Sequence, residues 1–301
     1  MDVSVIIVNY NTLEVTRNCI NSIYDHTEGI NFEVILVDNS SSDGSKEIFE
    51  VDSRLTYIYL DNNVGFGRAN NIGLSKASGD YVLFLNSDTL LLNNAIKIMH
   101  EEICTRKQMK IGTLGCMLSG IDGNTIHSYG DFFTIKSLIN NALKAYTKNP
   151  FRRTRYIPQG IEVKDDFFRV DYVTGADAMV PMSVIKKIGA FDSSFFMYCE
   201  DCYMQYVYTQ HGYSSYISIK PQIMHLESVS TNRSNASHNL KKKILIEKSR
   251  FIYIKKTSLK CQYKFFRILY FILRFPFILK PTLNFSEKKR YFSMLISSVR
   301  L

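Results

Sequence analysis

Short apolar runs separated by helix-length segments fill the first third of the chain. The runs occupy residues 3–8, 32–37, 55–60 and 81–85. Continuous apolar runs of this length are typical of strands buried on both faces. Segments 13–24 and 65–77 space their apolar residues three and four apart, as amphipathic helices do. Strand and helix in alternation predict an α/β fold with a mixed, mainly parallel central sheet flanked by helices.

Polar side chains follow two of these strands at the point where each strand ends. The run at 81–85 ends in Asn86, Ser87 and Asp88, and the run at 32–37 ends in Asp38. The carboxyl ends of parallel strands form the edge where open α/β sheets bind ligands. Asp88 can equally cap the helix that follows it.

A dinucleotide-binding dehydrogenase is the first enzyme class to test. Its glycine-rich turn follows the first strand, where this chain reads NYNT. Gly65 and Gly67 come only after the third strand, with Asn70 where a third glycine belongs. The position of these glycines and their pattern both exclude a dinucleotide-binding dehydrogenase. A nucleotidyltransferase, which needs a Gly-rich loop with Arg or Lys at the same turn, is disfavoured for the same reason.

The acids at the strand ends suit a nucleotide. Asp38 can accept hydrogen bonds from a base or ribose, and Tyr10 can stack on the base. The phosphates then extend toward Asp88, and a carboxylate beside a diphosphate needs a divalent cation between them.

Four motifs resemble the nucleotide-binding half of family 2 glycosyltransferases, which have the GT-A fold, and most of all their rhamnosyltransferase-like branch. They are VSVIIVNYNT, VDNSSSDGS, NNVGFGRANNIGL and GDYVLFLNSDT. The resemblance implies a nucleotide site whose residues are Val8, Tyr10, Asp38, Arg68 and Ser87. It also implies that Asp88 binds Mg²⁺ or Mn²⁺. The family often has D-x-D at this point, and here Asn86 takes the first position.

A second resemblance lies at residues 189–201, where GAFDSSFFMYCED is similar to the family's catalytic-base segment. Adjacent acids in the first turn of a helix can also be simple capping. An inverting transfer needs a base for the proton of the attacking hydroxyl, away from the metal that would lower its basicity. The resemblance assigns this role to Asp201, with Glu200 in support.

A single histidine, His225, follows an apolar run near the end of the predicted sheet. Such a histidine is commonly a packed structural residue. In the family, a His followed shortly by Ser at this place reaches back to the metal. His225 is therefore the predicted second protein ligand, which compensates in part for Asn86.

The middle of the chain is less informative. Arg153 and Arg155 either meet a phosphate or belong to a solvated basic loop. Cys199 and Cys202 form a C-x-x-C without a second pair, so reduced thiols and a zinc site are the two interpretations.

The charge of +9 is concentrated at the C-terminal end. Residues 241–301 hold 16 Lys and Arg against two glutamates, a net charge of +14 that leaves −5 on the rest. This distribution argues against a nucleic-acid binder. The apolar stretch at 265–279 is too short to span a bilayer and fits an interfacial amphipathic segment on anionic lipid. The alternative is a pair of helices packed on the catalytic domain.

The predicted organisation is a catalytic domain at 1–238, with a nucleotide half at 1–118 and an acceptor half at 119–238. A basic, aromatic-rich helical tail follows at 239–301. The predicted reaction is inverting transfer of one hexosyl or rhamnosyl unit from a nucleotide diphosphate sugar to a lipid-linked or oligosaccharide precursor of a surface glycan. The absence of tryptophan argues against a polymerising enzyme with Q-x-x-R-W. Without a signal peptide, we expect a cytoplasmic protein, peripheral on the cytoplasmic face of the membrane. The alternative function is a non-catalytic nucleotide-sugar-binding or scaffolding protein.

Overall fold

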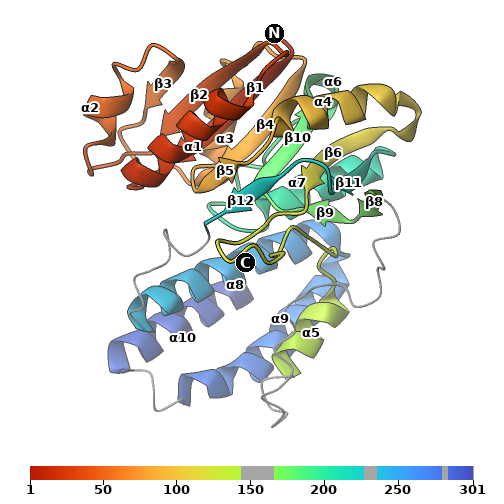
Figure 1. The fold of residues 1–301 in the computed structure, drawn as a ribbon. Coiled ribbons are helices and arrows are strands. Elements are labelled where there is room, and N and C mark those ends of the chain that lie inside the picture. The colour runs from red at the N-terminus through yellow and green to blue at the C-terminus, as the bar shows by residue number, and fades with distance from the viewer. Residues whose placement is uncertain (144–165, 227–235, 280–283, 301) are drawn as a thin grey trace. The chain divides into compact units, whose positions relative to one another are not determined.

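The computed structural model describes residues 1–143, 166–226, 236–279 and 284–300 (Figure 1). The chain divides into two compact units. The first contains residues 1–132 and the described residues of 166–196 and 200–226. The second contains residues 133–143 and 197–199 and the described residues from 236 onward. Arg153 and Arg155 lie outside the described residues.

An eight-stranded mixed sheet forms the centre of the first unit, in the order β3-β2-β1-β4-β10-β6-β11-β8. The strands are β1 (Val3–Asn9), β2 (Phe32–Asp38), β3 (Leu55–Tyr59), β4 (Tyr81–Asn86), β6 (Ile111–Cys116), β8 (Phe167–Val170), β10 (Asp177–Pro181) and β11 (Ser214–Ser218). The first four strands are mutually parallel, and β10 runs antiparallel to both β4 and β6. The strands predicted from the four apolar runs are confirmed.

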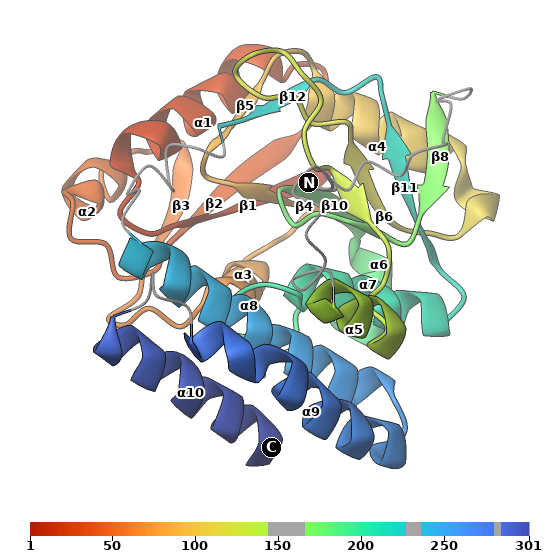
Figure 2. The same ribbon diagram turned by 90° about the horizontal axis from the view of Figure 1, so that it is seen from below.

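Helices cover both faces of this sheet (Figures 1 and 2). One face carries α1 (Leu13–His26), α2 (Ser45–Phe49) and α4 (Ala95–Thr105), and the other carries α3 (Phe66–Leu74), α6 (Met182–Ile188) and α7 (Glu200–Gln210). Alternate residues of β1 explain this layering, because Val5 and Ile7 pack in the first layer and Ile6 in the second. Each such fully buried aliphatic side chain stabilises the fold by roughly 1.5–3 kcal/mol.

Two small antiparallel sheets lie beside the main one. In one, β5 (Thr89–Leu91) pairs with β12 (Ile223–His225), and His225 lies opposite Thr89. In the other, β7 (Tyr129–Gly130) pairs with β9 (Tyr172–Val173). A short break that contains Gly175 separates β9 from β10.

The second unit is helical. It contains α5 (Ile135–Leu143), α8 (Ala236–Thr257), α9 (Lys260–Arg274), a 3₁₀ turn (Phe275–Leu279) and α10 (Phe285–Arg300). The sequence boundary after residue 238 falls inside α8. No helix in the described part of the chain is long and apolar enough to cross a membrane.

Helix α9 has two apolar faces. Tyr263, Phe266 and Tyr270 are buried, and the last two pack against Phe251 of α8. The opposite face of α9 exposes Phe265, Ile268 and Ile272, and the 3₁₀ turn that follows exposes Phe275 and Leu279.

Candidate functional site

The loops after β1 and β2 are tied together at the carboxyl edge of the sheet. Asn11 has φ 55° and Ser40 has φ 73°, so both loops turn sharply. The Asn11 backbone N–H donates to Ser41 Oγ at 2.9 Å, and the Ser42 N–H donates to Asn11 Oδ1 at 2.8 Å. Tyr10, the first residue of the loop after β1, is 49% exposed, and Val8 is partly buried. An exposed ring on a fixed loop can stack on a planar base.

Asp38 lies beneath this loop pair and is fully buried. Its Oδ1 accepts a hydrogen bond from the Ser41 backbone N–H at 2.7 Å. Its Oδ2 accepts from the Tyr57 hydroxyl at 3.1 Å and from Asn9 Nδ2 at 3.3 Å. The carboxylate therefore orders the loop, and its direct contact with a nucleotide stays a prediction.

A third loop, before α3, joins the same edge. Asn39 Oδ1 accepts from the Val64 N–H at 2.9 Å, and the Phe66 N–H donates to Phe196 O at 2.9 Å. Gly65 has φ 90°, and a Cβ there would stand 2.2 Å from Phe196 O, so only glycine fits. Arg68 is exposed and donates through Nε to Ser193 O at 2.8 Å, which leaves the rest of its guanidinium at the surface.

The predicted metal ligands meet although they are 137 residues apart. Asp88 Oδ1 lies 3.0 Å from His225 Nε2, and Asn86 Nδ2 lies 3.4 Å from the same nitrogen. Pairing of β12 with β5 produces this meeting, and the Leu226 N–H also donates to Asp88 O at 2.8 Å. Ser87 Oγ lies 3.3 Å from Thr12 Oγ1, which connects this corner to the first loop.

These side chains fit a hard divalent cation. Two ligands that lie about 2.1 Å from an octahedral cation, at right angles to each other, are about 3.0 Å apart. Asp88 Oδ1 and His225 Nε2 are also 3.0 Å apart. The side-chain oxygen and nitrogen of Asn86 are interchangeable by rotation of the amide, so an oxygen can face the same point. Among the described residues no group of three or more His, Cys, Asp or Glu could hold a metal. A cation here would therefore complete its shell with phosphate oxygens and water.

The same finding bears on zinc. Cys199 and Cys202 are both buried. Within the described ranges no further His, Cys, Asp or Glu joins them to make a metal-binding group.

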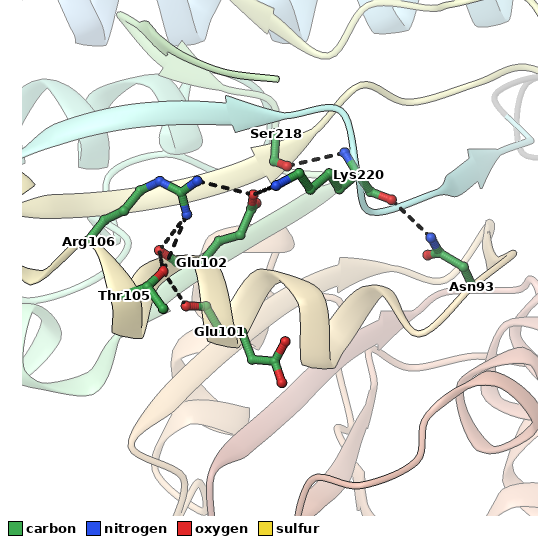
Figure 3. Close-up of polar contacts among 7 residues, drawn as sticks. All are labelled: Asn93, Glu101, Glu102, Thr105, Arg106, Ser218 and Lys220. Carbon is green, nitrogen blue, oxygen red and sulfur yellow. Dashed lines mark hydrogen bonds and ion pairs between the residues drawn. The ribbon is translucent and has the colours of Figure 1, made fainter. Parts of the chain in front are cut away.

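A short framework of polar contacts holds the turn that precedes β12 (Figure 3). The Asn93 side chain donates to Lys220 O at 2.9 Å and accepts from the Gln222 N–H at 2.9 Å. Glu102 of α4 is 5% exposed, and its Oε1 lies 3.6 Å from both Arg106 and Lys220. These contacts fix the turn between β11 and β12, and hence the position of the strand that ends in His225.

The predicted base is held at the first turn of α7. Asp201 Oδ2 accepts from the Gly175 N–H at 2.8 Å, and Oδ1 accepts from the Cys202 N–H at 2.7 Å. Burial raises the pKa of Asp201, while the two backbone N–H groups and the charge of His127 lower it. The net shift is upward, as suits a general base. Glu200 is buried beside Gly67.

Two hydrogen bonds connect Asp201 to the metal-ligand corner. The Asn86 N–H donates to Ala176 O at 2.9 Å, and the adjacent Gly175 donates to Asp201. Candidate base and candidate ligands therefore occupy one edge of one sheet.

Sequence reasoning missed two residues at this edge. Asp177, at the start of β10, is fully buried and accepts from the Cys116 N–H at 2.6 Å. Burial raises its pKa to about 6. Exposed His127 acts on Asp201 through its charge. Asp177 carried a signal, since an acid inside an apolar run is rarely buried without a reason. His127 carried none.

Comparison with known proteins agrees with this architecture. The family model described as glycosyl transferase family 2 matches residues 4–170, more than half of the chain. Glycosyltransferase GlyG of Streptococcus pneumoniae serotype 4 is 32% identical over 105 residues, which cover 34% of this chain and 35% of that protein. O-antigen biosynthesis protein RfbC of Myxococcus xanthus is 24% identical over 239 residues, 76% of this chain and 17% of that protein. The chain thus spans about a third or less of these relatives.

Solved structures share the fold at low sequence identity. GalNAc-T7, crystallised with UDP, GalNAc and Mn²⁺, superimposes with a TM-score of 0.55 at 15% identity over 75% of this chain and 44% of that one. Staphylococcus aureus TarS gives 0.54 at 16% identity over 99% of this chain and 43% of that one. The fold is GT-A, and the chain belongs to glycosyl transferase family 2.

Proposed function

We propose that this protein moves one sugar, with inversion, from a nucleotide diphosphate sugar to a hydroxyl of a surface-glycan precursor. The observation that carries the proposal is the 3.0 Å approach of Asp88 Oδ1 to His225 Nε2 at the edge that also holds Asp201. Tyr10 and Val8 would contact the base, and Arg68 and Ser87 the phosphates or ribose.

Asp88 and His225 would hold Mg²⁺ or Mn²⁺, with Asn86 as a further oxygen donor. Bound there, the cation would neutralise charge on the diphosphate leaving group. The protein supplies two fixed ligands and leaves the remaining positions to the donor and to water.

Asp201 would act on the acceptor. The acceptor oxygen forms a bond to the anomeric carbon, the bond from that carbon to the diphosphate breaks, and the hydroxyl proton passes to Asp201. A raised pKa makes the Asp201 carboxylate a stronger base than an ordinary aspartate. Glu200, next to it in the first turn of α7, would orient the acceptor or the helix.

A lipid-linked acceptor and a peripheral position on the cytoplasmic face are part of the proposal. The outward side chains of α9 support it, since Phe265, Ile268 and Ile272 are 67%, 59% and 60% exposed. Aromatic and aliphatic rows flanked by cations favour the interface of an anionic bilayer.

The test is turnover of dTDP-rhamnose and UDP-hexoses with Mn²⁺, scored as transfer to glycan acceptors and as slow donor hydrolysis. Asp201→Asn should lower kcat by about 10²–10⁴ while nucleotide binding stays intact. Asp25→Asn, a change of the same kind at an exposed position of α1, is the matched control.

Two outcomes would contradict the assignment. Full turnover by Asp201→Asn would remove Asp201 as the base. Donor binding without transfer or hydrolysis by the unaltered protein would favour the non-catalytic binding or scaffolding function.

A further inference from the structure

Helices α8 and α10 enclose a hollow in the second unit. The two helices are in contact and lie side by side in Figure 1, and the hollow between them measures about 390 Å³. Its floor is apolar, formed by the buried side chains of Ile244 and Met294. Its walls carry three exposed cations, Lys248 from α8 and Lys289 and Arg290 from α10.

Small hydroxyl side chains line the α10 side of the hollow. Ser286, Ser293 and Ser297 are spaced seven and four residues apart, so they lie along one face of the helix with Lys289 and Arg290 between them. Serine leaves room that a larger residue would fill. Each hydroxyl can donate a hydrogen bond to an anionic oxygen.

The cations of the hollow are not neutralised by the acids of the same helices. Glu247 of α8 is buried and pairs with Arg274 at 3.3 Å and with the Tyr270 hydroxyl. Glu287 of α10 accepts the Asn284 backbone N–H at 3.0 Å and so caps its own helix. In the described part of the chain, the three lining cations form no ion pair, so their charge is available to a ligand.

We propose that this hollow binds a phosphate group carried by a membrane lipid. A guanidinium and two ammonium groups around serine hydroxyls match the oxygens of a phosphate. A lipid is the favoured source because Phe285, next to Ser286 in the chain, is 84% exposed and can enter the acyl region beside the headgroup. This site does not depend on the proposed transfer reaction, since it needs neither donor sugar nor metal.

The test measures binding of the full chain to phosphatidylcholine vesicles with and without phosphatidic acid. The variant Lys248→Gln/Lys289→Gln/Arg290→Gln should bind acidic vesicles about a hundredfold more weakly. The matched control is Lys255→Gln/Lys260→Gln/Lys264→Gln, which removes the same charge from exposed positions of α8 and α9 outside the hollow. The control variant should lose much less of its affinity for acidic vesicles. Equal losses in the two variants would overturn the proposal, because bulk charge would then explain binding.

Two further arms separate the remaining explanations. Ser293→Leu keeps all three cations and fills the hollow, so it should weaken vesicle binding as well; binding equal to that of the unaltered protein would overturn the site. Inorganic pyrophosphate should compete with acidic vesicles. A different result would overturn the lipid as the ligand. In that case Ser293→Leu abolishes saturable binding of pyrophosphate but leaves the binding of vesicles unchanged, which would indicate a soluble phosphate ligand.

Discussion

Three aspartates at one sheet edge differ in what their surroundings provide. Asp38 accepts hydrogen bonds from three protein donors and orders a loop. Asp201 accepts from two backbone N–H groups and keeps a raised pKa. Asp88 faces a histidine nitrogen at 3.0 Å. These surroundings differ as the proposed roles of the three aspartates differ: Asp38 in the nucleotide site, Asp201 as the proton acceptor and Asp88 as a metal ligand.

The fourth aspartate, Asp177, predicts a pH dependence of folding stability. Burial raises its pKa from 3.8 to about 6, so between these values the folded state holds a proton that the unfolded state has lost. Stability from this group is therefore complete below pH 3.8 and is lost as pH rises toward 6. Two pKa units correspond to about 2–3 kcal/mol.

Urea unfolding at several values of pH tests this prediction. Asp177→Asn should flatten the fall in unfolding free energy between pH 4 and 6, because an amide does not titrate in this range. The amide oxygen can still accept from the Cys116 N–H, so the variant should fold. Asp25→Asn, at an exposed position, should leave the slope as it was. If the unfolding free energy of the unaltered protein and of Asp177→Asn changed with pH in parallel, this would contradict a raised pKa of Asp177 in the folded state.

At the scale of elements, pairing of β12 with β5 brings His225 next to Asp88. The sequence shows that His225 follows an apolar run, and the family resemblance suggested that His225 is a metal ligand. Neither reveals what sets the position of the strand. That support comes from Asn93 and from Glu102, whose contacts lie in separate parts of the chain. Glu102 in particular reads as a solvated helix residue, because burial by a distant turn leaves no local pattern.

Substitution of Asn93 tests the role of this framework. Asn93→Ala removes both hydrogen bonds to the β11–β12 turn, so His225 should lose its fixed position. We expect the Mn²⁺ concentration for half-maximal activity to rise about tenfold, with kcat at saturating metal little changed.

Asn94→Ala is the control, since Asn94 also bonds one backbone carbonyl, that of Glu28, away from β12. Both variants should lose about 1–2 kcal/mol of stability, and only Asn93→Ala should change the metal dependence. Identical metal dependence in the two variants would argue against a positioning role.

At the scale of the whole molecule, apolar runs predicted the first unit well and the second unit poorly. Strands buried on both faces are continuous in sequence, so β1, β2, β3 and β4 could be located closely. The grouping of α5 with the C-terminal helices could not be predicted, because contacts between distant helices leave no periodicity in either. The charge of the tail was evident, whereas the hollow between α8 and α10 depends on packing.

The outward face of α9 gives a membrane prediction that leaves the fold intact. Phe265→Ser/Ile268→Ser/Ile272→Ser changes exposed side chains only, whereas truncation at residue 262 would also remove the buried Tyr263, Phe266 and Tyr270. Each of the three substitutions removes an apolar contact with the bilayer. We therefore expect the triple variant to sediment with anionic vesicles at least about tenfold more weakly than the unaltered protein. Val51→Ser/Ile121→Ser, at exposed apolar positions of the first unit, is the control. Equal sedimentation of all three proteins would contradict membrane binding through α9.

Binding of a nucleotide diphosphate sugar at the corner of Asp88 and His225 should depend on a divalent metal. The most direct measurement is the thermal midpoint of the protein against a panel of nucleotide sugars, with and without Mn²⁺. A ligand at a hundred times its Kd stabilises by about 2.7 kcal/mol, which corresponds to a rise of roughly 5–10 °C in Tm for a domain of this size. We expect such a rise for at least one nucleotide sugar, only with Mn²⁺, and we expect it to be lost in His225→Ala and Asp88→Asn. A rise that persists without metal or in both variants, or no rise with any nucleotide sugar, would contradict metal-dependent binding at this corner.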